Sequence, residues 1–157
     1  MIAVPIVSKD VESARADIKL SKESGADIVE LRLDYLLNIS ESGLKQLIRT
    51  GGIPKIVTLR RKKDGGNFRG TEKERIRILE KACLLGADYV DVEYDADFCV
   101  PAGAVTKVIC SYHDFERTPD VKGLVNTLET CLEMEPKPDV VKIVTMATKY
   151  ADNVAIF

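Results

Sequence analysis

Two side chains capable of covalent and proton-transfer chemistry stand near the ends of successive apolar segments. His113 is the only histidine and directly follows the apolar residues 107–112, while Lys142 lies in the middle of the next apolar segment, residues 139–144. Burial disfavours the charged form of a lysine and leaves a neutral amine that can attack a carbonyl carbon, and a nearby histidine can move the protons. Either residue alone is more often structural, because a strand lysine commonly extends its ammonium to water. The pair at two successive strand ends favours an active site.

Further polar residues alternate with apolar ones in three earlier segments. Alternate residues of a strand share one face, so each segment is expected to direct these side chains to one side of a sheet. They are Glu30, Arg32 and Asp34 in the first segment, Thr58 and Arg60 in the second, and Asp91 and Glu93 in the third. In a barrel such positions line the mouth, where catalytic residues lie. The alternative is a buried layer of ion pairs, which has more weight for Asp91 and Glu93 than for Glu30 and Arg60.

The elements that must position these side chains are short β-branched runs that alternate with helical patterns. The expected strands cover residues 2–7, 28–34, 55–60, 89–94, 107–112 and 140–146. Helix starts are indicated at Ser8, at Ser40, at Thr71 with its capping-box Glu74, and at the pair Thr118-Pro119. This alternation predicts an α/β fold with parallel strands and right-handed crossovers. The pattern alone leaves sheet or barrel open, and the inward-facing polar residues favour the barrel.

The composition excludes several classes of function. The 157 residues carry a formal net charge of -2, so no basic field attracts nucleic acid or an anionic membrane surface. Residues 1–7 are apolar but too short for a signal peptide or a membrane span. The four cysteines lack CxxC spacing, which favours reduced core thiols over disulfides or a zinc site. We therefore expect a cytoplasmic protein with a small-molecule partner.

Four segments together resemble one enzyme family. They are residues 30–34 (ELRLD), 58–60 (TLR), 111–119 (SYHDFERTP) and 141–146 (VKIVTM). In this order and spacing the chain resembles type I 3-dehydroquinate dehydratase, the Schiff-base enzyme of the shikimate pathway, from Ile2 to its last residue. The HDF…TP segment and the strand lysine are the most specific parts. The glycine-rich residues 64–66 are a weak signal by themselves.

The resemblance implies a (β/α)8 TIM-barrel fold and a lyase that dehydrates 3-dehydroquinate to 3-dehydroshikimate without metal or another cofactor. Lys142 would form an imine with the ring ketone, and His113 would remove and return protons. Asp64 aligns with a glutamate that orients the histidine in the family, and it is one methylene shorter.

The resemblance also assigns substrate contacts. Glu30 and Arg60 would hold substrate hydroxyls, and Arg32 would add positive potential near Lys142 that helps to keep the amine neutral.

The expected domain organisation is a single (β/α) barrel domain over residues 1–157 with about six βα units. Because such barrels typically need about 250 residues, we expect this domain to be incomplete at its C-terminal end, without the strands that carry the arginine for the substrate carboxylate. Two alternatives stay open: a class I aldolase-like Schiff-base barrel, and an inactive fragment that retains the Lys142 and His113 dyad. A homodimer is also compatible with the sequence.

Overall fold

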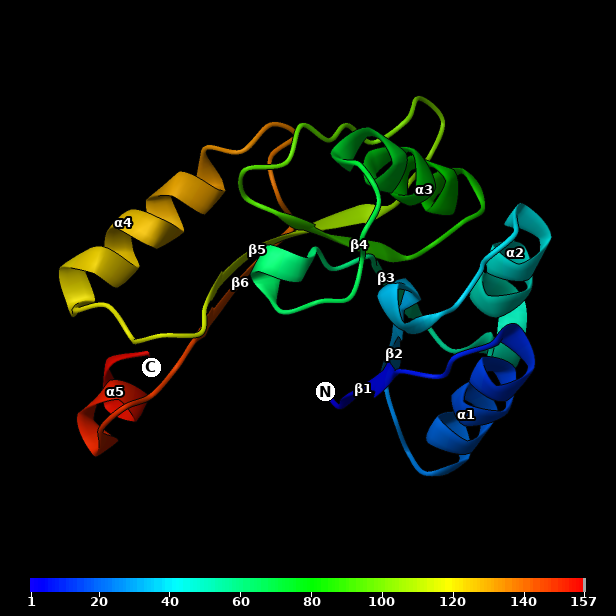
Figure 1. The fold of residues 1–157 in the computed structure, drawn as a ribbon, viewed down its shortest axis with the longest axis horizontal. Coiled ribbons are helices and arrows are strands. Elements are labelled where there is room, and N and C mark those ends of the chain that lie inside the picture. Colours follow the sequence, from blue (N-terminus) through cyan, green and yellow to red (C-terminus); the bar gives the residue numbers. More distant parts are fainter. Residues whose placement is uncertain (157) are drawn as a thin grey trace.

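The computed structural model describes residues 1–156, which form a curved sheet of six strands with helices arranged around it (Figure 1). The strands are β1 (Ala3–Ile6), β2 (Ile28–Arg32), β3 (Lys55–Thr58), β4 (Tyr89–Glu93), β5 (Lys107–Asp114) and β6 (Val140–Thr145). The helices are α1 (Val11–Glu23), α2 (Glu41–Arg49), α3 (Glu72–Leu84), α4 (Val121–Leu132) and α5 (Tyr150–Ala155). Three single turns of 3-10 helix are η1 (Leu33–Tyr35), η2 (Thr50–Gly52) and η3 (Lys62–Asp64).

The expected fold class is confirmed. All neighbouring strands pair in parallel and in chain order, so β1 and β6 lie at the two edges of the sheet. Parallel strands that pair in chain order and are joined by helical crossovers form the wall of a (β/α) barrel. Residues 94–106, between β4 and β5, form turns rather than a helix. The structure therefore has the architecture of six strands of the (β/α)8 pattern, curved into a partial barrel.

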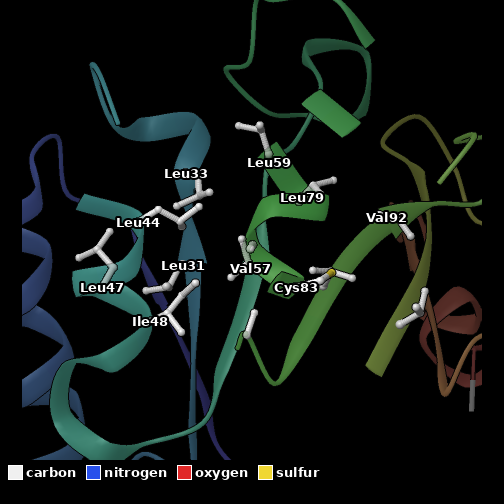
Figure 2. Packing of buried hydrophobic residues seen from close by; sticks show 14 of the residues in the cluster. Leu31, Leu33, Leu44, Leu47, Ile48, Val57, Leu59, Leu79, Cys83 and Val92 are labelled. Carbon is white, nitrogen blue, oxygen red and sulfur yellow. The ribbon is translucent and has the colours of Figure 1, made fainter. Parts of the chain in front are cut away.

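The hydrophobic core lies between the outer face of the sheet and the helices (Figure 2). Valines and leucines at alternate positions of the strands are almost fully buried there, while the residues between them face the inside of the curve. The buried strand residues include Val29, Leu31, Val57, Val90 and Val92, and the facing helix residues include Leu44, Leu47, Leu79 and Cys83. The same alternation that builds this core therefore assigns the polar residues to the inner face.

Two of the predicted helix starts are confirmed. Thr71 accepts a hydrogen bond from the backbone of Glu74, and the Glu74 carboxylate accepts one from the Thr71 backbone, which completes the capping box. Ser40 caps α2 by accepting from the backbone of Gly43. Such caps satisfy backbone donors that the first turn leaves without partners.

The other two predicted helix starts are wrong by two residues. Helix α1 is capped by Asp10 rather than Ser8, and α4 by Asp120 rather than Thr118. In both segments a carboxylate stands two residues after the hydroxyl and accepts the first-turn backbone hydrogen bond instead. Thr118 has other partners: its hydroxyl bonds the hydroxyl of Thr145, the last residue of β6, and the carbonyl of Met146.

Strand ends also differ from the prediction. Strand β2 ends at Arg32, and Asp34 lies in the following turn η1, where it binds Arg32 and the backbone of Asn67. Asp34 therefore does not continue the face of Glu30. Strand β5 runs on to Asp114, so His113 lies within a strand instead of directly after one.

Cys83, Cys110 and Cys131 are buried free thiols and Cys99 is exposed and free. Burial raises the pKa of Cys110, which makes it an unreactive thiol. Among residues 1–156, no helix combines the length and apolar character needed to cross a membrane.

Candidate active site

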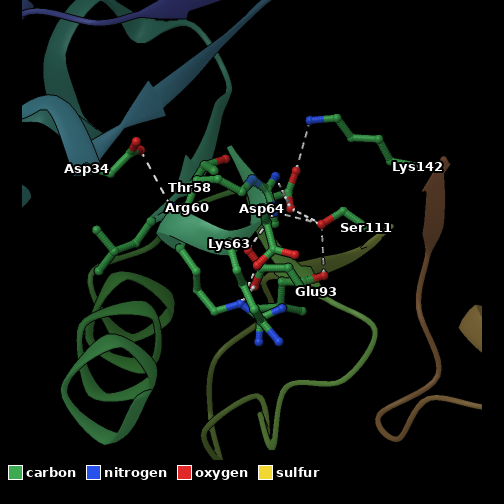
Figure 3. Close-up of polar contacts among 12 residues, drawn as sticks. Asp34, Thr58, Arg60, Lys63, Asp64, Glu93, Ser111 and Lys142 are labelled. Carbon is green, nitrogen blue, oxygen red and sulfur yellow. Dashed lines mark hydrogen bonds and ion pairs between the residues drawn. The ribbon is translucent and has the colours of Figure 1, made fainter. Parts of the chain in front are cut away.

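The polar inner face of the sheet gathers side chains from five neighbouring strands (Figure 3). These side chains come from the middle of a strand, from its carboxyl end or from just past it, and parallel barrels carry their catalytic groups at the carboxyl end. The residues are Glu30, Thr58, Arg60, Asp91, Glu93, Ser111, His113 and Lys142.

Lys142 stands at the open side of this cluster. Its Nζ donates a hydrogen bond to Oδ2 of Asp91 at 3.1 Å and lies 3.8 Å from Oε1 of Glu30. The Lys142 side chain is 38% exposed, so it is less buried than its apolar sequence neighbours predict. Glu30 is held in place by the hydroxyl of Thr58, which donates to Oε1 at 2.7 Å. The amine is therefore fixed by carboxylates and still open to a ligand.

Arg60 lies beneath the lysine and is 4% exposed. Its guanidinium donates to Asp91 at 2.7 Å, to Glu93 at 2.8 Å and to the hydroxyl of Ser111 at 2.9 Å. Burial opposes its charge, but the two carboxylates outweigh burial and raise its pKa. Arg60 is therefore a member of the buried ion-pair layer together with Asp91 and Glu93, although the sequence analysis favoured a ligand role for it.

A second buried arginine supports this layer from the helix side. Arg75 on α3 is fully buried, and its Nη1 lies 2.7 Å from Oε2 of Glu93. Sequence analysis did not identify Arg75, because it sits in the charged run 72–77, which is typical of a solvated helix face. Ser111 was also missed, although it shares a strand face with His113 two residues later, and that spacing was the available signal.

The environment of His113 favours its neutral form, which can accept a proton. Burial first, and then the charge of Arg60, lowers the pKa of His113 to about 4, so the imidazole is neutral near pH 7. Within residues 1–156, its buried Nδ1 has no hydrogen-bond partner. The ring of Phe115 stacks on the imidazole with a centroid distance of 5.8 Å. A neutral imidazole one strand away from a lysine amine can carry out proton transfer beside an imine.

The remaining two predicted site residues are engaged by local partners. Asp64 accepts a hydrogen bond from Nε of Arg61 at 2.6 Å and makes none to His113 within the described residues. Arg32 is paired with Asp34 at 2.8 Å and its guanidinium lies 5.0 Å from the centre of the Tyr35 ring. The structure thus brings Lys142, Glu30, Arg60 and His113 to the inner face of the curved sheet, while Asp64 and Arg32 bind neighbours in the loops above it.

The part of the chain that the structure describes contains no cluster of three or more His, Cys, Asp or Glu side chains arranged to hold a metal ion. The carboxylates Asp91 and Glu93 are already neutralised by arginines. The groups at this face suited to covalent and proton-transfer chemistry are the amine of Lys142 and the imidazole of His113.

Comparisons with known proteins agree with this geometry. The family model described as type I 3-dehydroquinase matches residues 2–157. The 3-dehydroquinate dehydratase of Methanococcus vannielii is 33% identical over 171 residues, which span 98% of this chain and 77% of that protein. The solved type I 3-dehydroquinate dehydratase of Clostridium difficile superposes with a TM-score of 0.88 at 26% identity, over 98% of this chain and 66% of that one.

A more distant neighbour shows how widely the architecture is shared. A Toxoplasma gondii chain described as a deoxyribose-phosphate aldolase has a TM-score of 0.57 at 12% identity, which is a likeness of fold alone. The family model, in contrast, covers the chain almost from end to end. The chain therefore belongs to the type I 3-dehydroquinase family.

Proposed function

We propose that this chain is a hydro-lyase that converts 3-dehydroquinate to 3-dehydroshikimate and water through an imine on Lys142. The observation that carries the proposal is an accessible lysine amine held on the inner face of the sheet, next to the strand that carries a neutral imidazole. An amine and a base so placed can acidify and then remove a proton beside a ketone.

The proposed sequence of steps uses two residues. The ammonium of Lys142 gives up a proton, and the neutral amine attacks the ketone carbon to form the C–N bond. The ketone oxygen takes up that proton and a second one from the nitrogen and leaves as water, which gives an iminium. His113 takes the proton from the neighbouring carbon, and the electron pair of the C–H bond forms an enamine. The enamine expels the hydroxyl group, which takes the proton back from His113 and leaves as water. A second water hydrolyses the imine and frees Lys142.

Four further residues are proposed to support the substrate and the base. Glu30 and Arg32 would contact substrate hydroxyls at the mouth, because both side chains are part-buried rather than enclosed. Arg60 would form the charged floor beneath the substrate, and Asp64 would approach His113 once its pairing with Arg61 loosens. The charge of Asp64 already acts on His113 in the direction that raises the pKa.

The relatives support this function over the aldolase alternative. The Methanococcus vannielii protein is named 3-dehydroquinate dehydratase, and the Clostridium difficile structure is of a type I enzyme with covalently modified comenic acid. The aldolase neighbour shares the fold at 12% identity and offers no comparable match.

Reductive trapping tests the proposal directly. Incubation of the folded protein with 3-dehydroquinate and borohydride is expected to add the mass of the reduced ligand to the peptide that contains Lys142. The other lysines serve as internal controls, and Lys142→Met should abolish the adduct. A folded protein that gains no mass would contradict the proposal, whereas an adduct without turnover would support the alternative of an inactive form that retains the dyad.

We also propose that the protein works in the cytoplasm and forms a homodimer. Free thiols support a reducing compartment. The apolar side chains of Val121, Val125, Leu128 and Leu132 are exposed along α4 and support an association of copies. Light scattering after size-exclusion chromatography should give twice the chain mass; a monomer at micromolar concentration would contradict the dimer.

A further inference from the structure

Asp91 links the accessible lysine to the buried ion-pair layer. Its Oδ2 accepts the hydrogen bond from Nζ of Lys142 at 3.1 Å, and its Oδ1 accepts from Arg60 at 2.7 Å and from the hydroxyl of Ser111 at 2.6 Å. The side chain is fully enclosed. Both oxygens are therefore occupied, by donors from β5, from β6 and from the segment that follows β3.

We propose that Asp91 is a positioning residue for the nucleophile: its carboxylate holds Nζ of Lys142 in place and faces the positive charge on that nitrogen both before and after the imine forms. This inference rests on the function proposed above. It adds a role for a residue that sequence analysis treated as a member of a structural ion pair.

The charge balance of the reaction explains why an anion belongs at this position. A protonated lysine and a ketone give an iminium and one water, so the nitrogen carries a single positive charge at the start and at the end of the step. The amine is neutral only while it attacks. A fixed carboxylate next to that nitrogen stabilises the charge of the iminium without reorganisation.

Asp91 is suited to remain an anion throughout. Burial favours its protonated form, but Arg60 and then Lys142 outweigh burial and lower the pKa of Asp91. Because Oδ1 is held by two short hydrogen bonds, Oδ2 has a defined direction toward Lys142.

The other charged groups around Lys142 are less well placed for this role. Glu30 on β2 lies 3.8 Å away, beyond hydrogen-bond distance, and binds Thr58. Arg60, two residues past the end of β3, is a cation that Glu93 also neutralises, and His113 on β5 is neutral near pH 7. Asp91 is the carboxylate in hydrogen-bond contact with the amine.

A substrate-independent experiment tests the electrostatic part. Competitive acylation with acetic anhydride across a pH series, read by peptide mass spectrometry, gives the pH at which Lys142 is half reactive. In Asp91→Asn the ammonium loses its anion, so this pH should fall by about one unit or more. The matched control is Glu93→Gln, which removes a buried carboxylate from the same strand face and the same arginine without touching Lys142. Equal midpoints in the wild type and in Asp91→Asn, or equal shifts in both variants, would overturn the proposal.

Turnover separates positioning from structure. Asp91→Asn should lower kcat at least about tenfold, since one unit of differential interaction equals a factor of ten. Asp91→Glu keeps the charge but moves it, so its acylation midpoint should stay near that of the wild type while kcat falls. If Asp91→Asn does not fold, Asp91→Glu still tests the proposal. An unchanged kcat in folded Asp91→Glu would contradict it. If the wild type forms no adduct with 3-dehydroquinate, the proposed function fails while the acylation series still tests Asp91.

Discussion

Strands β4 and β6 have similar backbone pairing but very different surroundings. Strand β4 pairs in parallel on both sides, and its residues Val90 to Glu93 are all buried, two of them apolar and two charged. Strand β6 matches β5 over six residue pairs, yet its side chains are half-buried or exposed. Helix α3 covers the outer face at β4, whereas α4 and α5 leave many apolar side chains exposed beside β6. Figure 1 shows these two helices on the side of the molecule away from α1 and α2.

The difference shows that hydrogen bonding between strands does not by itself bury a strand, because both faces of a parallel sheet need cover. The two strands also supply residues with different roles in the candidate site. The proposed nucleophile Lys142 comes from the open strand, where a ligand can reach it, and Asp91 comes from the enclosed strand, where its position is fixed.

Removing the buried arginine of α3 should produce the largest loss of stability and so test the enclosed side of this comparison. Arg75→Ala leaves Glu93 without its closest cation on the helix side, and breaking a buried pair in this way costs about 3–5 kcal/mol. Denaturant unfolding should show the loss, while Arg77→Ala, at an exposed position of the same helix, should stay within about 0.5 kcal/mol of the wild type. Similar values for the two variants would show that Arg75 is not structural.

The cores beneath β4 and β6 should also differ in their response to a cavity. Leu79→Ala removes a fully buried side chain and should cost about 2–5 kcal/mol. Leu128 on α4 is 40% exposed, so the same truncation there removes less buried surface and should cost clearly less. Paired urea titrations measure both. Equal losses would mean that α4 is covered in solution.

His113 lies between the two regions and should give stability a dependence on pH. The unfolded histidine binds a proton below its ordinary pKa of 6.5, whereas the folded one does so only near 4. Between these values the unfolded state binds more protons, so stability should fall as the pH is lowered from 6.5 to 4. Thermal melts of the wild type and His113→Gln across this range should differ in slope, with the smaller slope in the variant. Identical slopes would show that His113 titrates normally in the folded chain.

The smallest effect should come from the helix caps. Thr71→Ala removes the capping box of α3 and should cost about 1 kcal/mol in global unfolding. Asp120→Ala removes the equivalent cap of α4, and there we expect hydrogen exchange to accelerate within α4 with little change in global stability, since that helix is less buried. Loss of global stability in both variants would remove the distinction between the two helices.

Much of the fold could be predicted from the sequence because local patterns determine it. Alternation such as Val29 and Leu31 around Glu30 fixes the two faces of a strand, and the capping box at Thr71 fixes a helix start. The errors arose where two residues compete for one role, as Asp10 replaced Ser8 and Asp120 replaced Thr118. The spacing of residues in the sequence does not reveal which of two nearby side-chain oxygens will accept the hydrogen bond of a backbone amide.

The site was predictable only in part. Lys142 and His113 stood out by residue type, but their partners depend on distances between strands that no linear pattern contains. Asp64 stands at the position that the family resemblance indicates, but its side chain binds Arg61. Asp91 was expected to be one member of an ion pair, and it also accepts a hydrogen bond from Lys142. Arg75 was hidden because its burial is set by the packing of α3 on the sheet.

The stacking of Phe115 on His113 has a consequence for how this sequence can change. A Cβ atom at position 65 would lie 2.7 Å from the Phe115 ring, and Gly65 also has a φ of +78°, which L side chains rarely adopt. Positions 65 and 115 therefore share one volume between the loops that follow β3 and β5. Substitutions at these two positions are not independent: a larger residue at 65 requires a smaller one at 115, and the imidazole then loses the ring that covers it.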